Sequence, residues 1–125
     1  MKVLSIEQIN KLKELGVDVK PKGMCLMYTS DSSDDYYLKY GESTCEDDIV
    51  AFTLQDIIEL LPKSILIKNV KHWVCISQNC LLTEFQIMYF DGYNSYNVVK
   101  QNKSLLQAAY EMLIWVIENG YLKTK

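Results

Sequence analysis

Three stretches of the chain place apolar residues three or four positions apart, which is the spacing of one face of an α-helix. They cover residues 5–16, 53–61 and 104–120. The first stretch mixes its apolar stripe with lysine and glutamate, which predicts an amphipathic helix lying on a core. The last, SLLQAAYEMLIWVIENG, is apolar on almost every side. We therefore expect this C-terminal helix to be central to the fold and covered on more than one side.

The ends of these helices carry typical capping residues. Ser5 is followed three positions later by Gln8, and Ser104 by Gln107, and each pair predicts a capping box at a helix start. Gly120 follows the last helix, where a left-handed residue closes a helix. Within the last helix we expect Trp115 to be buried.

Six short runs rich in β-branched and aromatic residues predict strands. They are residues 24–29, 36–40, 64–68, 72–78, 84–90 and 93–99. The order of elements predicts an α+β fold, with an antiparallel sheet of five to six strands, three helices mainly on one face and the C-terminal helix central. At 125 residues, the chain fits a single α+β domain over residues 1–125.

Asp91 and Gly92 separate the last two predicted strands. Asp-Gly between two such runs is the strongest short signal for a two-residue hairpin, because a type I′ turn needs positive φ at both central residues. The turn would place Phe90 opposite Tyr93, and it fixes which residues share a face. Ile87 then faces inward, toward the C-terminal helix.

The outward face of the predicted sheet is unusually apolar. Alternation along a strand puts Trp73 on this face, together with residues of the last two strands. The outward set is Trp73, Met88, Phe90 and Tyr93. A sheet face in water rarely shows this much apolar surface. These four are the candidate binding residues.

Tyrosine is abundant, with nine in the chain. Several fall on predicted strands: Tyr36, Tyr37, Tyr40, Tyr89, Tyr93 and Tyr96. Tyrosine is a good strand residue and is also favoured where one end of a side chain is dry and the other wet, as in interfaces. Both interpretations, strand packing and a recognition surface, stay open.

The charges are unevenly distributed. Residues 31–59 hold nine carboxylates and the single base Lys39, whereas the whole chain has a net charge of −3. All thirteen basic residues are lysine, so the chain lacks the planar arginine fork that binds phosphate and guanine in pairs of hydrogen bonds. We therefore expect no nucleic acid as a partner. The 41–48 segment is an acidic loop whose composition favours disorder.

Neither a membrane nor an exported location is indicated. The C-terminal helix is short and interrupted by Gln107 and Glu111, so we expect it not to span a bilayer. The N-terminus, MKVLSIEQINKLKELG, has no uninterrupted apolar run and does not resemble a secretory signal. These features predict a cytoplasmic protein without a membrane partner.

The cysteines predict no metal or cofactor site. Cys25, Cys45, Cys75 and Cys80 form no C-x-x-C pair, which favours buried free thiols in a reducing compartment over disulfides. His72 with Cys75 and Cys80 offers three zinc ligands at most, and a structural site needs a fourth. The five glycines are isolated from one another, so there is no glycine-rich phosphate loop.

His72 is the only histidine, and it decides whether a Cys–His couple is feasible. Nucleophilic catalysis needs a thiolate beside an oriented imidazole. Cys75 is three residues away on the same strand and points to the opposite face. Pairing of His72 with Cys25, Cys45 or Cys80 stays open. We expect an imidazole near solvent at a strand start.

Three stretches resemble a group of small uncharacterised proteins of gut Bacteroidales, often carried on phage-like or other mobile elements. The stretches are FTLQDIIELLP at 52–62, AAYEMLIWVIENGYLKT at 108–124 and SIEQINKLKELGVD at 5–18. The resemblance implies a bacterial origin, a cytoplasmic location and a single domain. It brings no activity and therefore no catalytic residue.

Two functions from different classes follow from these patterns. The first is a non-enzymatic protein-binding or adaptor module, in which the outward sheet face holds a protein partner or a second copy of the chain. The alternative is a small hydrolase or transferase that uses His72 with Cys80 or Cys25. The sequence contains no complete catalytic constellation, which favours the binding module.

Overall fold

A computed structural model describes the chain apart from residues 1, 31–35, 45, 79–82, 93–95 and 123–125. The chain divides into two compact units, Met1–Thr53 and Leu54–Lys123, and each is described by itself. The expectation that residues 1–125 form a single domain stays a prediction.

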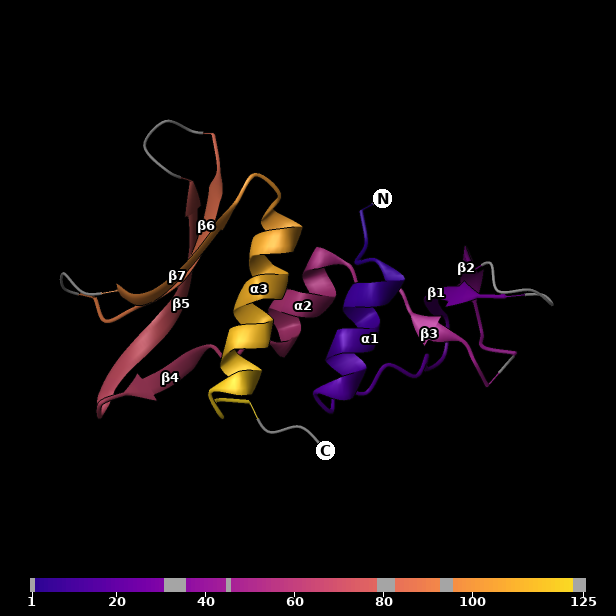
Figure 1. The fold of residues 1–125 in the computed structure, drawn as a ribbon, viewed down its shortest axis with the longest axis horizontal. Helices are drawn as coiled ribbons and strands as arrows, with labels where there is room; N and C mark the ends of the chain where they lie inside the picture. The colour runs from indigo at the N-terminus through magenta and orange to yellow at the C-terminus, as the bar shows by residue number, and fades with distance from the viewer. Residues whose placement is uncertain (1, 31–35, 45, 79–82, 93–95, 123–125) are drawn as a thin grey trace. The chain divides into compact units, whose positions relative to one another are not determined.

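Unit 1 combines one helix with a small antiparallel sheet (Figure 1). Its elements are α1 (Ile6–Glu14), β1 (Cys25–Thr29), β2 (Tyr37–Gly41) and β3 (Ile49–Val50). The strand order is β2-β1-β3, with β1 in the centre. The N-terminal segment is tied to this unit at Leu4, whose N–H donates to the Phe52 carbonyl and whose carbonyl accepts from the Tyr28 hydroxyl, both at 2.9 Å.

Helix α1 is capped at both ends, and its N-terminal cap is the one that the sequence predicts. The Ser5 hydroxyl accepts from the Gln8 N–H, and the Gln8 side chain accepts from the Ser5 N–H, so the capping box is confirmed. At the other end Gly16 has φ +95°, and Val17 N–H donates to the Leu12 carbonyl at 3.0 Å. This hydrogen bond is typical of a helix that ends with a residue in the left-handed conformation.

Unit 2 holds the remaining elements. They are α2 (Leu54–Leu60), β4 (Ser64–Ile67), β5 (Val70–Gln78), β6 (Phe85–Phe90), β7 (Tyr96–Asn102) and α3 (Leu105–Glu118). The four strands form an antiparallel sheet in chain order, β4-β5-β6-β7. Helix α3 packs against β6, β7 and α2, and Figure 1 shows α2 and α3 on the same side of this sheet.

The α+β class is confirmed, but the sheet is divided differently from the prediction. The described residues contain two antiparallel sheets, of three and four strands, in place of one sheet of five to six. Helix α2 lies between β3 and β4 in the chain, so no hairpin joins the two groups of strands. Consequently two helices, and not three, accompany the larger sheet, because α1 belongs to unit 1.

Helix α3 supplies a large part of the core of unit 2. Its buried residues are Leu106, Ala108, Ala109, Met112, Leu113 and Val116. The Ser104 hydroxyl accepts from the Gln107 N–H as predicted. The second half of the expected box is different, because the Ser104 N–H donates to the Asn102 side chain at 2.9 Å. Asn102 therefore takes the place of the Gln107 side chain as the acceptor for the Ser104 N–H.

The C-terminus of α3 closes through a Schellman motif at Gly120, which has φ +78°. Tyr121 N–H donates to the Val116 carbonyl at 2.9 Å, and Gly120 N–H to the Ile117 carbonyl at 3.1 Å. The Tyr121 ring stacks on Trp115, with 5.3 Å between ring centroids. Trp115 is therefore half-buried under a neighbouring ring, whereas the sequence predicted a buried side chain.

The predicted register between the last two strands is wrong. Asp91 and Gly92 do not form a two-residue hairpin, because Phe90 pairs with Tyr96 and Tyr89 pairs with Val98. A register shift at Tyr89/Phe90 lies next to the connection. Most β6 residues pair with a β7 residue that lies four positions closer to the C-terminus than the predicted partner. An even shift preserves the faces of a strand, so Ile87 stays on the inward side of β6, and Met88 stays on the outward side.

Candidate functional site

The sheet of unit 2 has one face that is packed and one that is not. Ile87 and Tyr89 of β6 and Val98 of β7 are buried, and these strands are the ones that contact α3. Side chains alternate along a strand, so Met88 and Phe90 point to the opposite side. The structure thus places both residues on the outward face, as the sequence predicts.

The outward face gathers apolar residues from three strands. Trp73 of β5 lies directly opposite Phe90 of β6, and Cys75 lies opposite Met88. We call the outward patch the set Leu66, Trp73, Cys75, Met88 and Phe90. Trp73 is 47% exposed and Leu66 of β4 is 61% exposed. The other three are half-buried.

Two residues change the predicted site. Tyr93, the fourth candidate, lies outside the residues that the structure describes. Leu66 was not among the candidates, although it was detectable. Its neighbour Ile65 pairs with His72 and both are buried, so alternation sends Leu66 to the other face. The signal was the SILI run, which is apolar on both sides.

Polar groups border the outward patch at its two ends. At one end, Lys71 Nζ lies 5.6 Å from the centre of the Trp73 ring, a cation–π distance. At the other, a row of side-chain hydrogen bonds links β5, β6 and β7. The Ser77 hydroxyl donates to Gln86 at 3.4 Å, Gln86 donates to Gln101 at 2.7 Å, and Gln101 donates to Glu84 at 3.0 Å. An apolar centre with a polar rim is the usual anatomy of a protein–protein interface.

His72 is buried, with 1% of its surface exposed, and the expectation of an imidazole near solvent is wrong. Strand β5 begins at Val70, two residues earlier than predicted, so His72 is already inside the strand and faces inward. Its Nδ1 lies 2.8 Å from the Val70 carbonyl oxygen. A carbonyl only accepts hydrogen bonds, so Nδ1 carries the proton.

The Cys–His combinations have different outcomes. His72 and Cys75 occupy opposite faces of β5, because His72 pairs with buried Ile65 and Cys75 pairs with Met88 of the outward patch. Cys45 and Cys80 lie outside the described residues. Cys25 belongs to unit 1, so its pairing with His72 stays a prediction.

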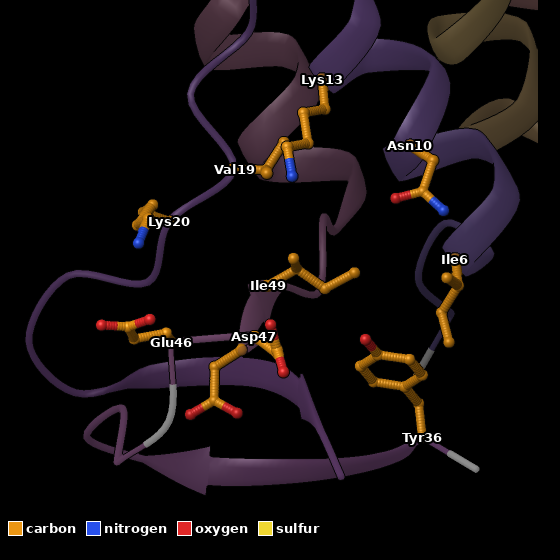
Figure 2. Close-up of a pocket in the computed structure, with 10 residues that line it drawn as sticks. Ile6, Asn10, Lys13, Val19, Lys20, Tyr36, Glu46, Asp47 and Ile49 are labelled. Carbon is orange, nitrogen blue, oxygen red and sulfur yellow. The ribbon is translucent and has the colours of Figure 1, made fainter. Parts of the chain in front are cut away.

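Unit 1 contains a pocket of about 180 Å³, drawn in Figure 2. Its apolar lining includes Ile6 and Ile49, and its rim includes Tyr36, Glu46 and Asp47. Lysines line it as well, so both signs of charge are present. Within the described part of the chain, no three His, Cys, Asp or Glu residues are grouped so that they could hold a metal ion.

Asp48, at the end of the acidic 41–48 segment, lines the same pocket. Asp48 is almost completely buried. Its Oδ2 accepts hydrogen bonds from the Ser43 hydroxyl at 2.9 Å and from the Thr44 N–H at 3.1 Å. Hydrogen bonds to a buried carboxylate stabilise the charge that burial alone would penalise. The expectation of disorder in the 41–48 segment stays a prediction.

Burial also changes the acidity of two tyrosines in unit 2. The Tyr89 hydroxyl donates to the Pro62 carbonyl at 2.6 Å, and burial raises the pKa of Tyr89 well above its ordinary value. Burial raises the pKa of Tyr110 too. Both shifts favour the neutral phenol, and the neutral Tyr89 hydroxyl is the form that donates to Pro62.

Among the helices that the structure describes, none has both the length and the apolar character needed to cross a membrane. No known protein family, curated protein or solved structure matches the chain.

Proposed function

We propose that the protein is a binding module that holds a protein partner on the outward patch. The observation that carries this proposal is the pair Trp73 and Phe90, which lie opposite one another on the face away from α3. Trp73 keeps about half of its surface in water, at 47%. Tryptophan is the residue type most enriched among the side chains that dominate binding energy at interfaces.

The chemistry of the patch indicates the kind of partner. Leu66 and Trp73 offer apolar surface whose removal from water contributes roughly 25 cal/mol for each Å² buried. Lys71 stands over the Trp73 ring and adds a positive charge at the rim. We therefore propose a partner with an apolar face that carries a carboxylate at its edge, opposite Lys71.

The location proposed for this interaction is the cytoplasm. Cys25 and Cys75 are free thiols in the structure, and reduced cysteines are typical of cytoplasmic proteins. Cys75 belongs to the outward patch. In an oxidising compartment this thiol could form disulfides within the proposed interface, which a reducing cytoplasm prevents.

A matched pair of lysine variants tests the proposal. Trp73 and Ile76 lie on the same strand, are 47% and 46% exposed, and point to opposite faces. Trp73→Lys should lower the amount of a specific partner captured from the source cells at least tenfold, while Ile76→Lys should leave it unchanged. Both variants should keep the circular dichroism spectrum of the parent chain.

Self-association is measured on the same three proteins by sedimentation equilibrium. If the partner is a second copy of the chain, Trp73→Lys should shift the dimer toward monomer and Ile76→Lys should not. Equal capture and equal mass for all three proteins would remove the outward patch as a binding surface. Equal loss in both variants would assign the effect to the fold.

A further inference from the structure

The pocket of unit 1 is lined by charged side chains of both signs. Lys13 of α1 and Lys20 are its basic residues, and Glu46 and Asp47, just before β3, are exposed acidic residues of its lining. Figure 2 shows Ile49 between the Lys13 and Asp47 side chains. In the part of unit 1 that the structure describes, no ion pair joins these lysines to these carboxylates. Both signs of charge can therefore bind a ligand in the pocket.

The backbone of unit 1 holds the basic and the acidic segments together. Val50 N–H donates to the Val19 carbonyl at 2.9 Å. Val19 directly precedes Lys20, and Val50 follows Asp47 by three positions, so this bond ties one charged segment to the other. Asp48 holds the acidic segment further, because its Oδ2 accepts two hydrogen bonds from the preceding loop. A site whose groups are in place before binding loses less conformational entropy when a ligand arrives.

The volume of the pocket limits the ligand to a small molecule. The pocket measures about 180 Å³, whereas drug-sized ligands occupy pockets of about 300–1,000 Å³. An apolar cavity of about 150 Å³ holds one benzene molecule. The pocket of unit 1 therefore fits a molecule slightly larger than benzene, and free amino acids with aliphatic side chains have this size.

The apolar lining favours a ligand that also has an apolar part. Ile6 and Ile49 are half-buried, and Val19 is buried. Figure 2 shows the Tyr36 ring on the same side of the pocket as Ile6. Contact with these side chains removes apolar surface of the ligand from water, which stabilises the complex.

The two kinds of charge select a zwitterion. A small anion such as phosphate would be attracted by the two lysines but repelled by the carboxylates, and a small cation would meet the reverse. A molecule that carries one group of each sign is attracted by both. A metal ion lacks a usual ligand set here, because no three His, Cys, Asp or Glu residues in the described part of the chain are grouped for one.

We propose that the pocket of unit 1 binds a free amino acid with an apolar side chain. The lysines Lys13 and Lys20 bind its carboxylate, and the carboxylates of Glu46 and Asp47 bind its ammonium group. Its side chain packs against Ile49. This pocket lies in unit 1, so the proposal does not depend on the outward patch of unit 2.

Titration of the full chain with amino acids, followed by the NMR shifts of the backbone amides, tests the proposal. The probes are L-leucine, L-valine and L-methionine at millimolar concentration. We expect saturable shifts of the Lys20 and Ile49 amide signals with at least one of these probes. The absence of a saturable shift at these amides with all of them overturns the proposal.

Two derivatives of the best-binding amino acid test the role of each charge. The N-acetyl derivative lacks the ammonium group, and the amide derivative lacks the carboxylate. Each should bind at least tenfold more weakly than the parent amino acid. If the amide derivative binds equally well, the pocket takes a cation, and if the N-acetyl derivative does, it takes an anion. Either result overturns the zwitterion.

Matched variants test the location of the site. Lys13→Gln and Asp47→Asn each remove one charge from the pocket. Lys11→Gln and Glu42→Gln remove charges of the same signs at exposed positions outside its lining. The affinity for the best amino acid should fall at least fivefold in both pocket variants and stay unchanged in both controls. Equal affinities in all of these variants overturn the assignment to this pocket.

Discussion

Trp73 and Phe90 face each other across β5 and β6, on the side of the sheet that α3 does not cover. Their position follows from strand alternation, because the residues beside them, His72 and Tyr89, are both buried. The same alternation places Ile76 on the helix side, although Ile76 is as exposed as Trp73. The exposed fraction of a side chain therefore does not decide whether it belongs to the outward patch. Membership depends on the face of the sheet to which the side chain points.

The packing of α3 predicts a large cost for shortening a buried side chain. Leu113 is fully buried in this helix, so Leu113→Ala should lower the free energy of unfolding by about 2–5 kcal/mol. Glu118, exposed at the end of the same helix, is the control, and Glu118→Ala should change stability by less than about 0.5 kcal/mol. Urea unfolding followed by tryptophan fluorescence measures both. A loss below about 1 kcal/mol for Leu113→Ala would contradict the packing described for α3.

The end of α3 depends on a left-handed residue. A Cβ at Gly120 would meet no atom within 4 Å, so the cost of Gly120→Ala comes from the backbone conformation and should be about 1–2 kcal/mol. Gly120→Asn should cost less, because asparagine tolerates this conformation. Urea midpoints of the two variants test the order. Equal stability of the alanine and asparagine variants would argue against the Schellman closure.

The buried phenol of Tyr89 makes stability depend on alkaline pH. Its pKa is raised in the folded state by burial, so the unfolded chain loses this proton at a lower pH than the folded chain. The stabilising contribution is complete below the ordinary tyrosine pKa of about 10 and falls as pH rises above it. Tyr89→Phe should flatten this decline, whereas the exposed Tyr40→Phe should leave it intact. Urea midpoints between pH 8 and 11 give the comparison.

His72 should be chemically inert while the protein is folded. It is buried and its Nδ1 proton is held by the Val70 carbonyl. Diethyl pyrocarbonate should therefore modify it slowly in the native protein and rapidly in urea, as followed by absorbance. Rapid modification of the folded protein would show an accessible imidazole and would revive the Cys–His alternative.

Local signals in the sequence predict the ends of the helices well. The Ser5 and Gln8 capping box and the left-handed Gly120 depend on residues within one turn of each other, so the chain itself contains the information. The faces of β5 and β6 are also predictable, because alternation with period two needs only one buried position as a reference. For that reason the sequence correctly predicts that Trp73 and Phe90 share the outward face.

Features that depend on distant pairing were not predictable. The Asp91-Gly92 turn is overridden by the pairing of β6 with β7, which begins further from the turn. The small sheet of unit 1 is completed by β1 pairing with β3, a two-residue strand too short to detect by periodicity. The buried position of Asp48 is a local feature, with hydrogen bonds from Ser43 and Thr44 five and four residues away, but composition does not reveal it either.

The accessibility of Cys75 tests the central claim most directly, because this thiol lies within the outward patch, opposite Met88. The measurement is its alkylation rate in a chain where Cys25, Cys45 and Cys80 are replaced by serine. We expect the rate to fall at least fivefold when the captured partner is added or when self-association is complete. An alkylation rate that is the same in the free and in the bound protein would contradict a partner on this face.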